Sequence, residues 1–236
     1  MTLILFVAYI LQGVSEIFNN ECQTTGDNMC EYMKDLMCVV KYAQRNPDTL
    51  YDVILRIHGT VQRKTDHLTN IFNQYNEKGF VKDDAFSWRM DYINHFSENR
   101  KYYYDNMIKI LRSKKSKAII SDKILELFLQ ANGLGLAKAS FAGLLCTGMN
   151  EFSCLDSNLL KWNNLDPKIT DYNKKCKDKD KLRERRQNYF SIVQQTGGGH
   201  FNYIKWCDKI GGESKKFIDG VDVSRHHPVW FTREAR

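Results

Sequence analysis

The sequence predicts an all-α protein of two helical lobes. Apolar residues recur at three- and four-residue intervals in one segment after another, which is the period of an amphipathic helix. Hydrophobic residues make up 42% of the chain and only 3 of its 236 residues are proline, which favours an ordered chain with a buried core. Because this length suits one generous domain or two small lobes that share a core, we expect residues 1–236 to form one unit.

The chain begins with an uninterrupted apolar run, residues 3–11. A membrane span needs about 20 apolar residues, so we expect no stable membrane insertion. No Lys or Arg precedes Lys34, so the basic part of a secretory signal is missing. We expect a buried first helix, with a signal or peripheral anchor as the alternative. The cysteines form no secreted disulfide framework, which indicates reduced thiols and an intracellular protein.

Four helices are predicted before the middle of the chain. Their ranges are 29–45, 49–76, 85–96 and 102–111. Asn46-Pro47 ends the first helix, and Pro47 suits a turn or the first position of the next one. Gly59 weakens the second helix locally, so a kink or two shorter helices are both compatible with it.

The second half continues as helices joined by short polar segments. A basic loop, 112–117, precedes a helix over 123–131 that Ser121-Asp122 would cap. The later helices are predicted at 136–145, from 159 onward, at 178–196, at 200–210 and at 214–221. The glycines at 197–199 follow a helix and have no Lys-Ser/Thr after them, so they indicate a flexible helix stop and not a nucleotide loop.

A glycine hairpin, Gly133-Leu134-Gly135, lies between the two central helices. Two glycines around one aliphatic residue allow a tight turn and leave backbone N–H groups uncovered at the start of the second helix. Because such a helix end attracts anions, we expect it to contact a nucleic-acid phosphate. Asp156 then follows a short apolar run.

These residues resemble the helix-hairpin-helix DNA glycosylase superfamily, in which apolar-x-Gly-apolar-Gly-x-x-x-Ala is followed by an Asp. The match covers roughly residues 121–162, with the hairpin in 121–150, the Asp loop in 151–162 and basic helices in 163–236. The resemblance implies that Asp156 is the catalytic carboxylate. It also implies a monovalent cation held by hairpin carbonyls. The DNA contacts that it implies in the hairpin are Gly133, Leu134, Gly135 and Ala137.

The family's lysine is displaced in this chain. Bifunctional members carry the Schiff-base lysine two residues after the second hairpin glycine, where this chain has Ala137. Lys138 comes one position later, which turns it about 100° around a helix. Either the hairpin has slipped and Lys138 is the nucleophile, or the chain resembles the monofunctional branch, which is the simpler interpretation. A phosphate contact or a solvated lysine is the further alternative for Lys138.

No metal site is predicted. The iron–sulfur members of the family have four closely spaced C-terminal cysteines, and Cys176 and Cys207 are too far apart to supply that motif. The adjacent His226 and His227 would point apart, and no other ligand spacing is recognisable.

The net charge of +7 is unevenly placed. Basic residues exceed acidic ones in segments 100–117 and 158–190, which flank the hairpin in sequence and suit a phosphate-binding face. The side chains that we expect there are Lys114, Lys115, Lys117, Arg183, Arg185 and Arg186.

The expected function is hydrolysis of the N-glycosidic bond of a damaged, mismatched or modified base by a monomer acting on DNA. A carboxylate at Asp156 would stabilise the oxocarbenium-like sugar or deprotonate the attacking water. Asp156 could equally cap the helix near Asn158, or do both. Two other functions stay open: a non-catalytic DNA-binding module from a virus or phage, and a viral structural or assembly protein. The compartment would be the cytoplasm or nucleus of a host cell.

Overall fold

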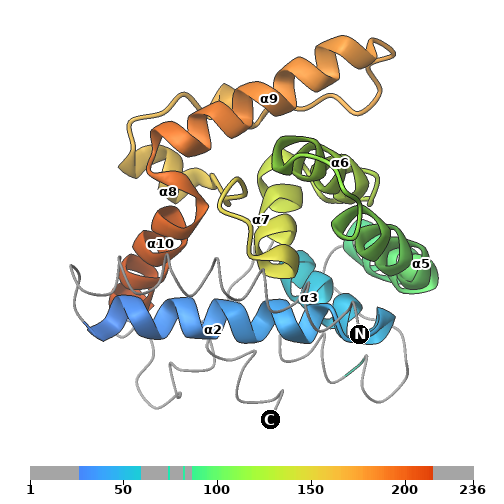
Figure 1. Ribbon diagram of the computed structural model, residues 1–236, viewed down its shortest axis with the longest axis horizontal. Helices are drawn as coiled ribbons and strands as arrows, with labels where there is room; N and C mark the ends of the chain where they lie inside the picture. The colour runs from blue at the N-terminus through green and yellow to red at the C-terminus, as the bar shows by residue number, and fades with distance from the viewer. Residues whose placement is uncertain (1–26, 60–73, 75–81, 83–86, 215–236) are drawn as a thin grey trace.

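The computed structural model describes residues 27–59, 74, 82 and 87–214 (Figure 1). All regular structure in these ranges is helical, which confirms the all-α class. The elements are α2 (Asp27–Ala43), α3 (Pro47–Gly59), α5 (Ser87–Leu111), α6 (Lys117–Leu129), α7 (Leu136–Thr147), α8 (Ser157–Trp162), the 3-10 helix η1 (Pro167–Thr170), α9 (Lys179–Gln195) and α10 (Gly198–Ser214). The expectations for residues 3–11, most of 60–76 and 215–228 lie outside these ranges.

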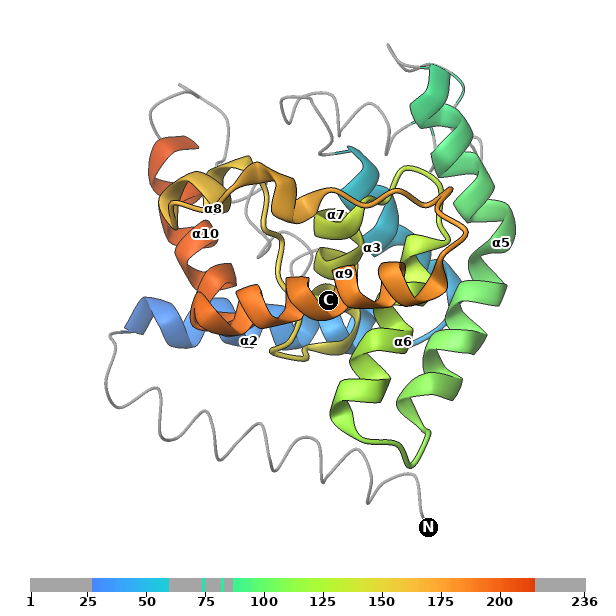
Figure 2. The same ribbon diagram turned by 90° about the horizontal axis from the view of Figure 1, so that it is seen from above.

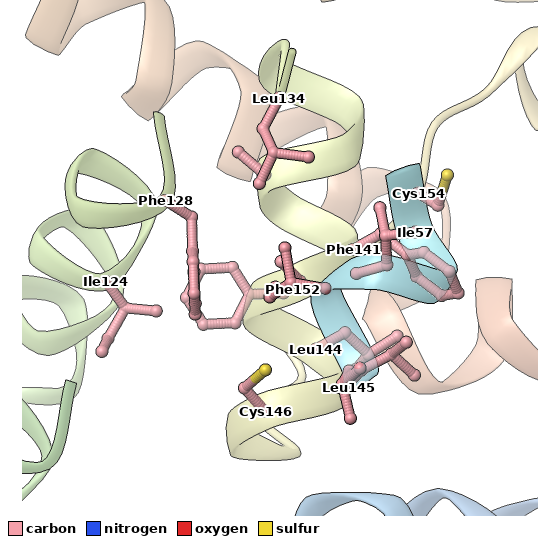
Figure 3. Packing of buried hydrophobic residues seen from close by; sticks show 14 of the residues in the cluster. Ile57, Ile124, Phe128, Leu134, Phe141, Leu144, Leu145, Cys146, Phe152 and Cys154 are labelled. Atoms are coloured by element: carbon pink, nitrogen blue, oxygen red, sulfur yellow. The ribbon is translucent and has the colours of Figure 1, made fainter. Parts of the chain in front are cut away.

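Helix α7 lies at the centre of the fold and packs against α2, α3 and α6 (Figure 1). Residues 139–146 of this helix are all buried. Four of those residues are Ala, Ser or Gly, so neighbouring side chains can approach the helix closely. A Cβ on Gly143 would lie 2.8 Å from the Phe152 ring. Figure 3 shows Phe128 of α6 and Phe152 beside this helix.

The start of α3 follows the sequence prediction. Pro47 is its first residue, where a missing N–H costs nothing. Oδ1 of Asn46 accepts hydrogen bonds from the N–H groups of Asp48 and Thr49, both at 2.9 Å. Asn46 therefore caps the helix as well as ending the segment before it.

Helix α5 is continuous over Ser87–Leu111, so the prediction of two separate helices was wrong. Residues 97–101 are polar, but none of them is Gly or Pro. They form a solvated turn of one helix, in which Arg100 bonds both to the carbonyl of Ser97 at 2.7 Å and to Asp48 at 2.6 Å. Polarity alone is therefore a weak signal for the end of a helix.

Helix α6 begins at Lys117, earlier than predicted. Ser121 and Asp122 lie inside it and do not cap it. The Ser121 hydroxyl donates to the carbonyl of Lys117 at 2.9 Å, and Asp122 binds Arg186. The loop between α5 and α6 is correspondingly shorter.

The glycine triplet follows the end of α9 at Gln195, which confirms the predicted helix stop, and forms a tight junction with α10. Gly197 and Gly198 have φ values of +98° and +85°, and α10 begins at Gly198. The N–H of Gly199 donates to the carbonyl of Asn150 at 2.7 Å, and a Cβ there would lie 1.8 Å from the carbonyl oxygen of Phe152. Only glycine allows this close approach of two backbones.

Among the helices in the described ranges, none is both long enough and apolar enough to cross a membrane.

Candidate functional site

The glycine hairpin joins the end of α6 to the start of α7. Asn132, Gly133 and Gly135 are exposed, whereas Leu134 is buried under the turn (Figure 3). Gly133 has φ +78°, and a Cβ there would lie 2.4 Å from the Tyr92 ring. Gly135 has φ −75° and open space around it. The first glycine is therefore required by the backbone and its packing, and the second leaves the surface open.

No side chain caps the start of α7. Gly135 is its N-cap, and its carbonyl accepts from the N–H of Ala139 at 2.8 Å. Ala137, at the family's lysine position, is half-buried in the first turn. The positive end of a 12-residue helix therefore lies beside the exposed Gly135.

Asp156 is the N-cap of α8, so the capping interpretation is confirmed. Its Oδ1 accepts from the N–H groups of Asn158 at 3.0 Å and Leu159 at 2.9 Å. Its Oδ2 accepts from the indole N–H of Trp206 at 3.2 Å. Both oxygens of this half-buried carboxylate are thus held in place. Trp206 could not be predicted from a sequence pattern, because the contact joins two helices that are distant in sequence.

The backbone before Asp156 is fixed by two buried hydroxyl groups. Tyr189 of α9 donates to the carbonyl of Ser153 at 2.7 Å and accepts from the N–H of Leu155 at 3.2 Å. The N–H of Ser153 donates to the hydroxyl of Ser140 at 2.9 Å. Burial raises the pKa of Tyr189, which keeps its hydroxyl protonated. Helices α7 and α9 therefore set the path of the chain into the Asp156 cap.

Lys138 and Asp156 both lie within electrostatic range of the Cys154 thiol. Burial raises the pKa of Cys154 to about 11, the positive charge of Lys138 opposes this rise and the negative charge of Asp156 adds to it. Lys138 is half-buried on α7. The two residues that the resemblance concerns most, Lys138 and Asp156, therefore both act on one buried thiol.

A buried histidine, whose pKa is affected by three cations, lies beside the hairpin, and no pattern in the sequence predicted it. His58 at the end of α3 is 2% exposed, and its Cε1 atom lies 3.1 Å from the Cβ position of Gly133. The pKa of His58 is lowered to about 3, mainly by burial and further by the charges of Lys174, Lys138 and Arg89. We call these four residues the His58 cluster.

Two members of the His58 cluster are fixed by their own contacts. Nζ of Lys174, from the segment between η1 and α9, donates to the carbonyl of Ala131 in the hairpin at 2.7 Å. Desolvation lowers the pKa of Lys174 to about 8. The guanidinium carbon of Arg89, which is fully buried, lies 5.5 Å from the centre of the Trp88 ring. One hairpin carbonyl, that of Ala131, thus already has a cationic partner.

The predicted basic contacts divide into two groups. Lys114, Lys115 and Lys117 are exposed at the turn between α5 and α6, and Arg183 and Arg185 are exposed on α9. Lys117 also pairs with Glu151 at 3.0 Å. The pKa of Lys115 is lowered by the close approach of the Lys123 side chain and by the charge of that residue, so two basic side chains lie close together at the surface.

Arg186 does not belong to this basic surface. Its side chain is buried, and its Nε and Nη2 atoms bind the two oxygens of Asp122 at 2.7 and 3.1 Å. The hydroxyl of Tyr172 accepts from its Nη1 at 3.2 Å. Arg186 therefore joins α9 to α6, which corrects the prediction that it faces a phosphate.

The basic turn and the hairpin lie at opposite ends of α6 (Figure 2). Twelve residue steps separate Lys117 from Leu129, or about 18 Å along the helix axis. The basic turn and the hairpin are neighbours in sequence but are too far apart to contact the same phosphate group. Only an anion with several charged groups could contact both at once.

In the part of the chain that the structure describes, no group of three or more His, Cys, Asp or Glu side chains could hold a metal ion. Comparisons of the chain with models of known protein families, with curated proteins and with solved structures found no match.

Proposed function

We propose that this protein is a DNA glycosylase that hydrolyses the N-glycosidic bond of a damaged, mismatched or modified base, without a covalent intermediate. The placement of Asp156 carries this proposal, because its carboxylate is held in place at the start of α8. Lys138 and Asp156 both act on the Cys154 thiol. Lys138 lies in the first turn of α7, directly after the glycine hairpin. The proposed protein acts as a monomer on DNA inside a cell.

Asp156 has the acceptor capacity that the reaction needs. A carboxylate offers about four lone-pair sites, and Asp156 uses three, one of them on Oδ2. The remaining site on Oδ2 can accept a proton from water, whose oxygen then bonds to C1′ of the sugar. The base leaves with the electron pair of the broken bond. Positive charge on the sugar during this step is stabilised by the same carboxylate.

The hairpin and the basic residues supply the DNA-binding part of the proposal. The uncapped start of α7 offers backbone N–H groups beside exposed Gly133 and Gly135. Lys114, Lys115, Arg183 and Arg185 are exposed for phosphate contacts elsewhere on the surface. Ala137 at the Schiff-base position favours simple hydrolysis over amine attack.

The test incubates the protein with duplexes that each carry one altered or mispaired base and measures alkali-labile abasic sites. Asp156→Asn should abolish them, and because Asn caps helices about as well as Asp, it should leave the fold intact. Asp166→Asn is the matched control, since Asp166 caps η1 in the same way by accepting from the N–H of Lys168 at 2.9 Å. Borohydride trapping would reveal amine attack by Lys138.

A second candidate, a non-catalytic DNA-binding module, is favoured by one observation. Capping of α8 and the bond to Trp206 already account for an Asp at position 156. This candidate predicts salt-sensitive DNA binding with no abasic sites on any duplex, and equal binding by wild type and Asp156→Asn.

A further inference from the structure

We propose that the ammonium group of Lys174 is the cation of the glycine hairpin and takes the place of the monovalent metal ion that the resemblance implies there. The last carbonyls of a helix carry partial negative charge, so the backbone where α6 runs into the hairpin attracts a cation. The proposal concerns how the hairpin is held. It goes beyond the proposed function, because it stands whether or not the protein cleaves a glycosidic bond.

Helix α6 supplies no cation for its own C-terminal end. The last turn within Lys117–Leu129 contains no basic side chain. After this turn, the N–H of Ala131 bonds back to the carbonyl of Phe128 at 3.1 Å. The carbonyl of Ala131 accepts from the backbone N–H of Leu134 at 3.4 Å, which is longer than an ordinary hydrogen bond. This buried carbonyl therefore depends on a stronger donor from elsewhere in the chain.

Lys174, 43 positions further along the chain, supplies that donor and the positive charge. Its Nζ donates to the carbonyl of Ala131 at 2.7 Å, a distance typical of a charge-assisted hydrogen bond. Lys174 as a whole is exposed, but its ammonium lies against the hairpin, where desolvation lowers its pKa to about 8. The group is therefore still mainly protonated at neutral pH.

The segment between η1 and α9 holds Lys174 in this place. A tight turn around it brings the N–H of Cys176 to the carbonyl of Asn173 at 3.0 Å. Directly before the turn, the hydroxyl of Tyr172 accepts from Nη1 of the buried Arg186 at 3.2 Å. The backbone of Lys174 is thus fixed on both sides, as a positioned cation requires.

A metal ion does not fit on the same carbonyl. A carbonyl oxygen has two lone pairs, and those of Ala131 already accept from Lys174 and Leu134. A metal ion on this oxygen would also lie close to the ammonium group, and like charges at short range repel each other. The hairpin of this chain therefore carries an internal cation and needs none from solution.

Replacing the ions around the full chain tests the proposal. We would measure thermal unfolding in potassium chloride and in tetramethylammonium chloride at equal ionic strength, because the methyl groups of the second cation keep its charge away from a carbonyl. The wild type should unfold at the same temperature in both salts. Lys174→Met keeps the stem of the side chain without its charge and should unfold roughly 5 °C lower in the tetramethylammonium salt. Potassium should restore part of this loss in a saturable way.

Hydrogen exchange of the Leu134 amide reports on the hairpin itself, because this N–H shares the carbonyl of Ala131 with Lys174. Exchange should be faster in Lys174→Met and slower again when potassium is added. Lys175→Met, which replaces the exposed neighbour, is the matched control for general effects of the salts and should behave like the wild type in both measurements.

Three results would overturn the proposal. Saturable stabilisation of the wild type by potassium would mean that a metal ion is the hairpin cation. Equal behaviour of Lys174→Met and Lys175→Met would mean that the ammonium does not hold the hairpin. A loss in Lys174→Met that potassium does not restore would mean that the lysine acts through its shape and not as a cation. None of these measurements uses DNA cleavage, so they are independent of whether the protein is a glycosylase.

Discussion

The indole N–H of Trp206 donates to Oδ2 of Asp156 over 3.2 Å and joins α10 to the start of α8 across 50 positions of the chain. The Trp206 ring also lies against Phe141 of α7, with 6.0 Å between the ring centres. Helix α8 fixes one oxygen of the carboxylate, and α10 fixes the other. The direction of Oδ2 therefore depends on how α10 packs against α7.

Replacing Trp206 by Phe should remove the hydrogen bond to Oδ2 of Asp156 while an aromatic ring stays beside Phe141. Phe keeps an aromatic ring but cannot donate to Oδ2, and a hydrogen bond to a charged group contributes about 1.5–3 kcal/mol. We expect the free energy of unfolding, measured in urea, to fall by that amount. In the proposed enzyme, abasic-site formation should fall while duplex affinity is kept, because only the carboxylate is misdirected.

A double-mutant cycle with Asp156→Asn isolates the contact. The two substitutions should be non-additive by about 0.5–1.5 kcal/mol, since each removes part of the same interaction. Additive effects would show that Trp206 supports the fold through its ring alone.

Arg186 should stabilise the protein and contribute little to DNA binding. Its guanidinium is buried and binds both oxygens of Asp122, so Arg186→Ala leaves a half-buried carboxylate without its partner. We expect a loss of roughly 3 kcal/mol in the free energy of unfolding. Arg185→Ala, the exposed neighbour, should change stability by less than about 0.5 kcal/mol.

For the salt dependence of DNA binding, we expect an effect of replacing Arg185 and none of replacing Arg186. Removing an exposed phosphate contact lowers the slope of log K against log salt by about 1. Arg185→Ala should show this change. Arg186→Ala, measured at a temperature at which it is folded, should keep the slope of the wild type. A reduced slope for Arg186→Ala would contradict the structural role that its burial assigns.

The two hairpin glycines should respond differently to alanine. Gly133→Ala places a Cβ 2.4 Å from the Tyr92 ring on a backbone with φ +78°, so we expect a loss of about 2–4 kcal/mol from strain and overpacking. Gly135→Ala meets open space at φ −75° and should cost under about 1 kcal/mol, mostly from a poorer N-cap. Thermal or urea unfolding of both variants measures the difference.

The same pair tests the hairpin as a phosphate contact. Since Gly135→Ala should fold normally but places a methyl group at the open start of α7, weaker duplex binding by this variant would locate DNA there. Unchanged binding would move the contact elsewhere on the surface.

Features that depend on neighbours in sequence were predictable. The helical class follows from apolar periodicity, the hairpin from Gly133 and Gly135, and the helix starts at Pro47 and Ser157 from local capping chemistry. Helix ends without Gly or Pro were harder to predict. The solvated turn at 97–101 resembled a loop because a helix surface and a loop have the same composition.

Features that depend on tertiary contacts were not predictable from one sequence. Arg186 looked like its neighbour Arg185, and only the crossing of α9 over α6 brings it to Asp122, 64 positions away. His58 and Lys174 carry no local motif either. Each lies at the hairpin, His58 beside Gly133 and Lys174 on the carbonyl of Ala131, because α3 and the segment after η1 both reach it. Lys174 therefore adds a positive charge at the hairpin, although it lies outside the sequence pattern that defines the hairpin.

The buried His58 should make stability fall as the solution becomes acidic. In the folded protein the pKa of His58 is about 3, against 6.5 for an ordinary histidine. At a pH between these values the unfolded chain therefore binds a proton at His58 that the folded chain does not bind. The stability that neutral His58 contributes is complete above pH 6.5 and is lost as the pH falls toward 3. The loss approaches about 1.4 kcal/mol per pH unit, or about 2 kcal/mol between pH 7 and pH 5.

Urea unfolding of wild type and His58→Gln at about pH 7 and about pH 5 isolates this contribution from those of the carboxylates, which both proteins share. The variant should be less stable at neutral pH, because it disturbs the packing against Gly133 and Tyr92, but it should lose about 2 kcal/mol less on acidification. An equal loss in both proteins would mean that His58 is protonated in the folded state.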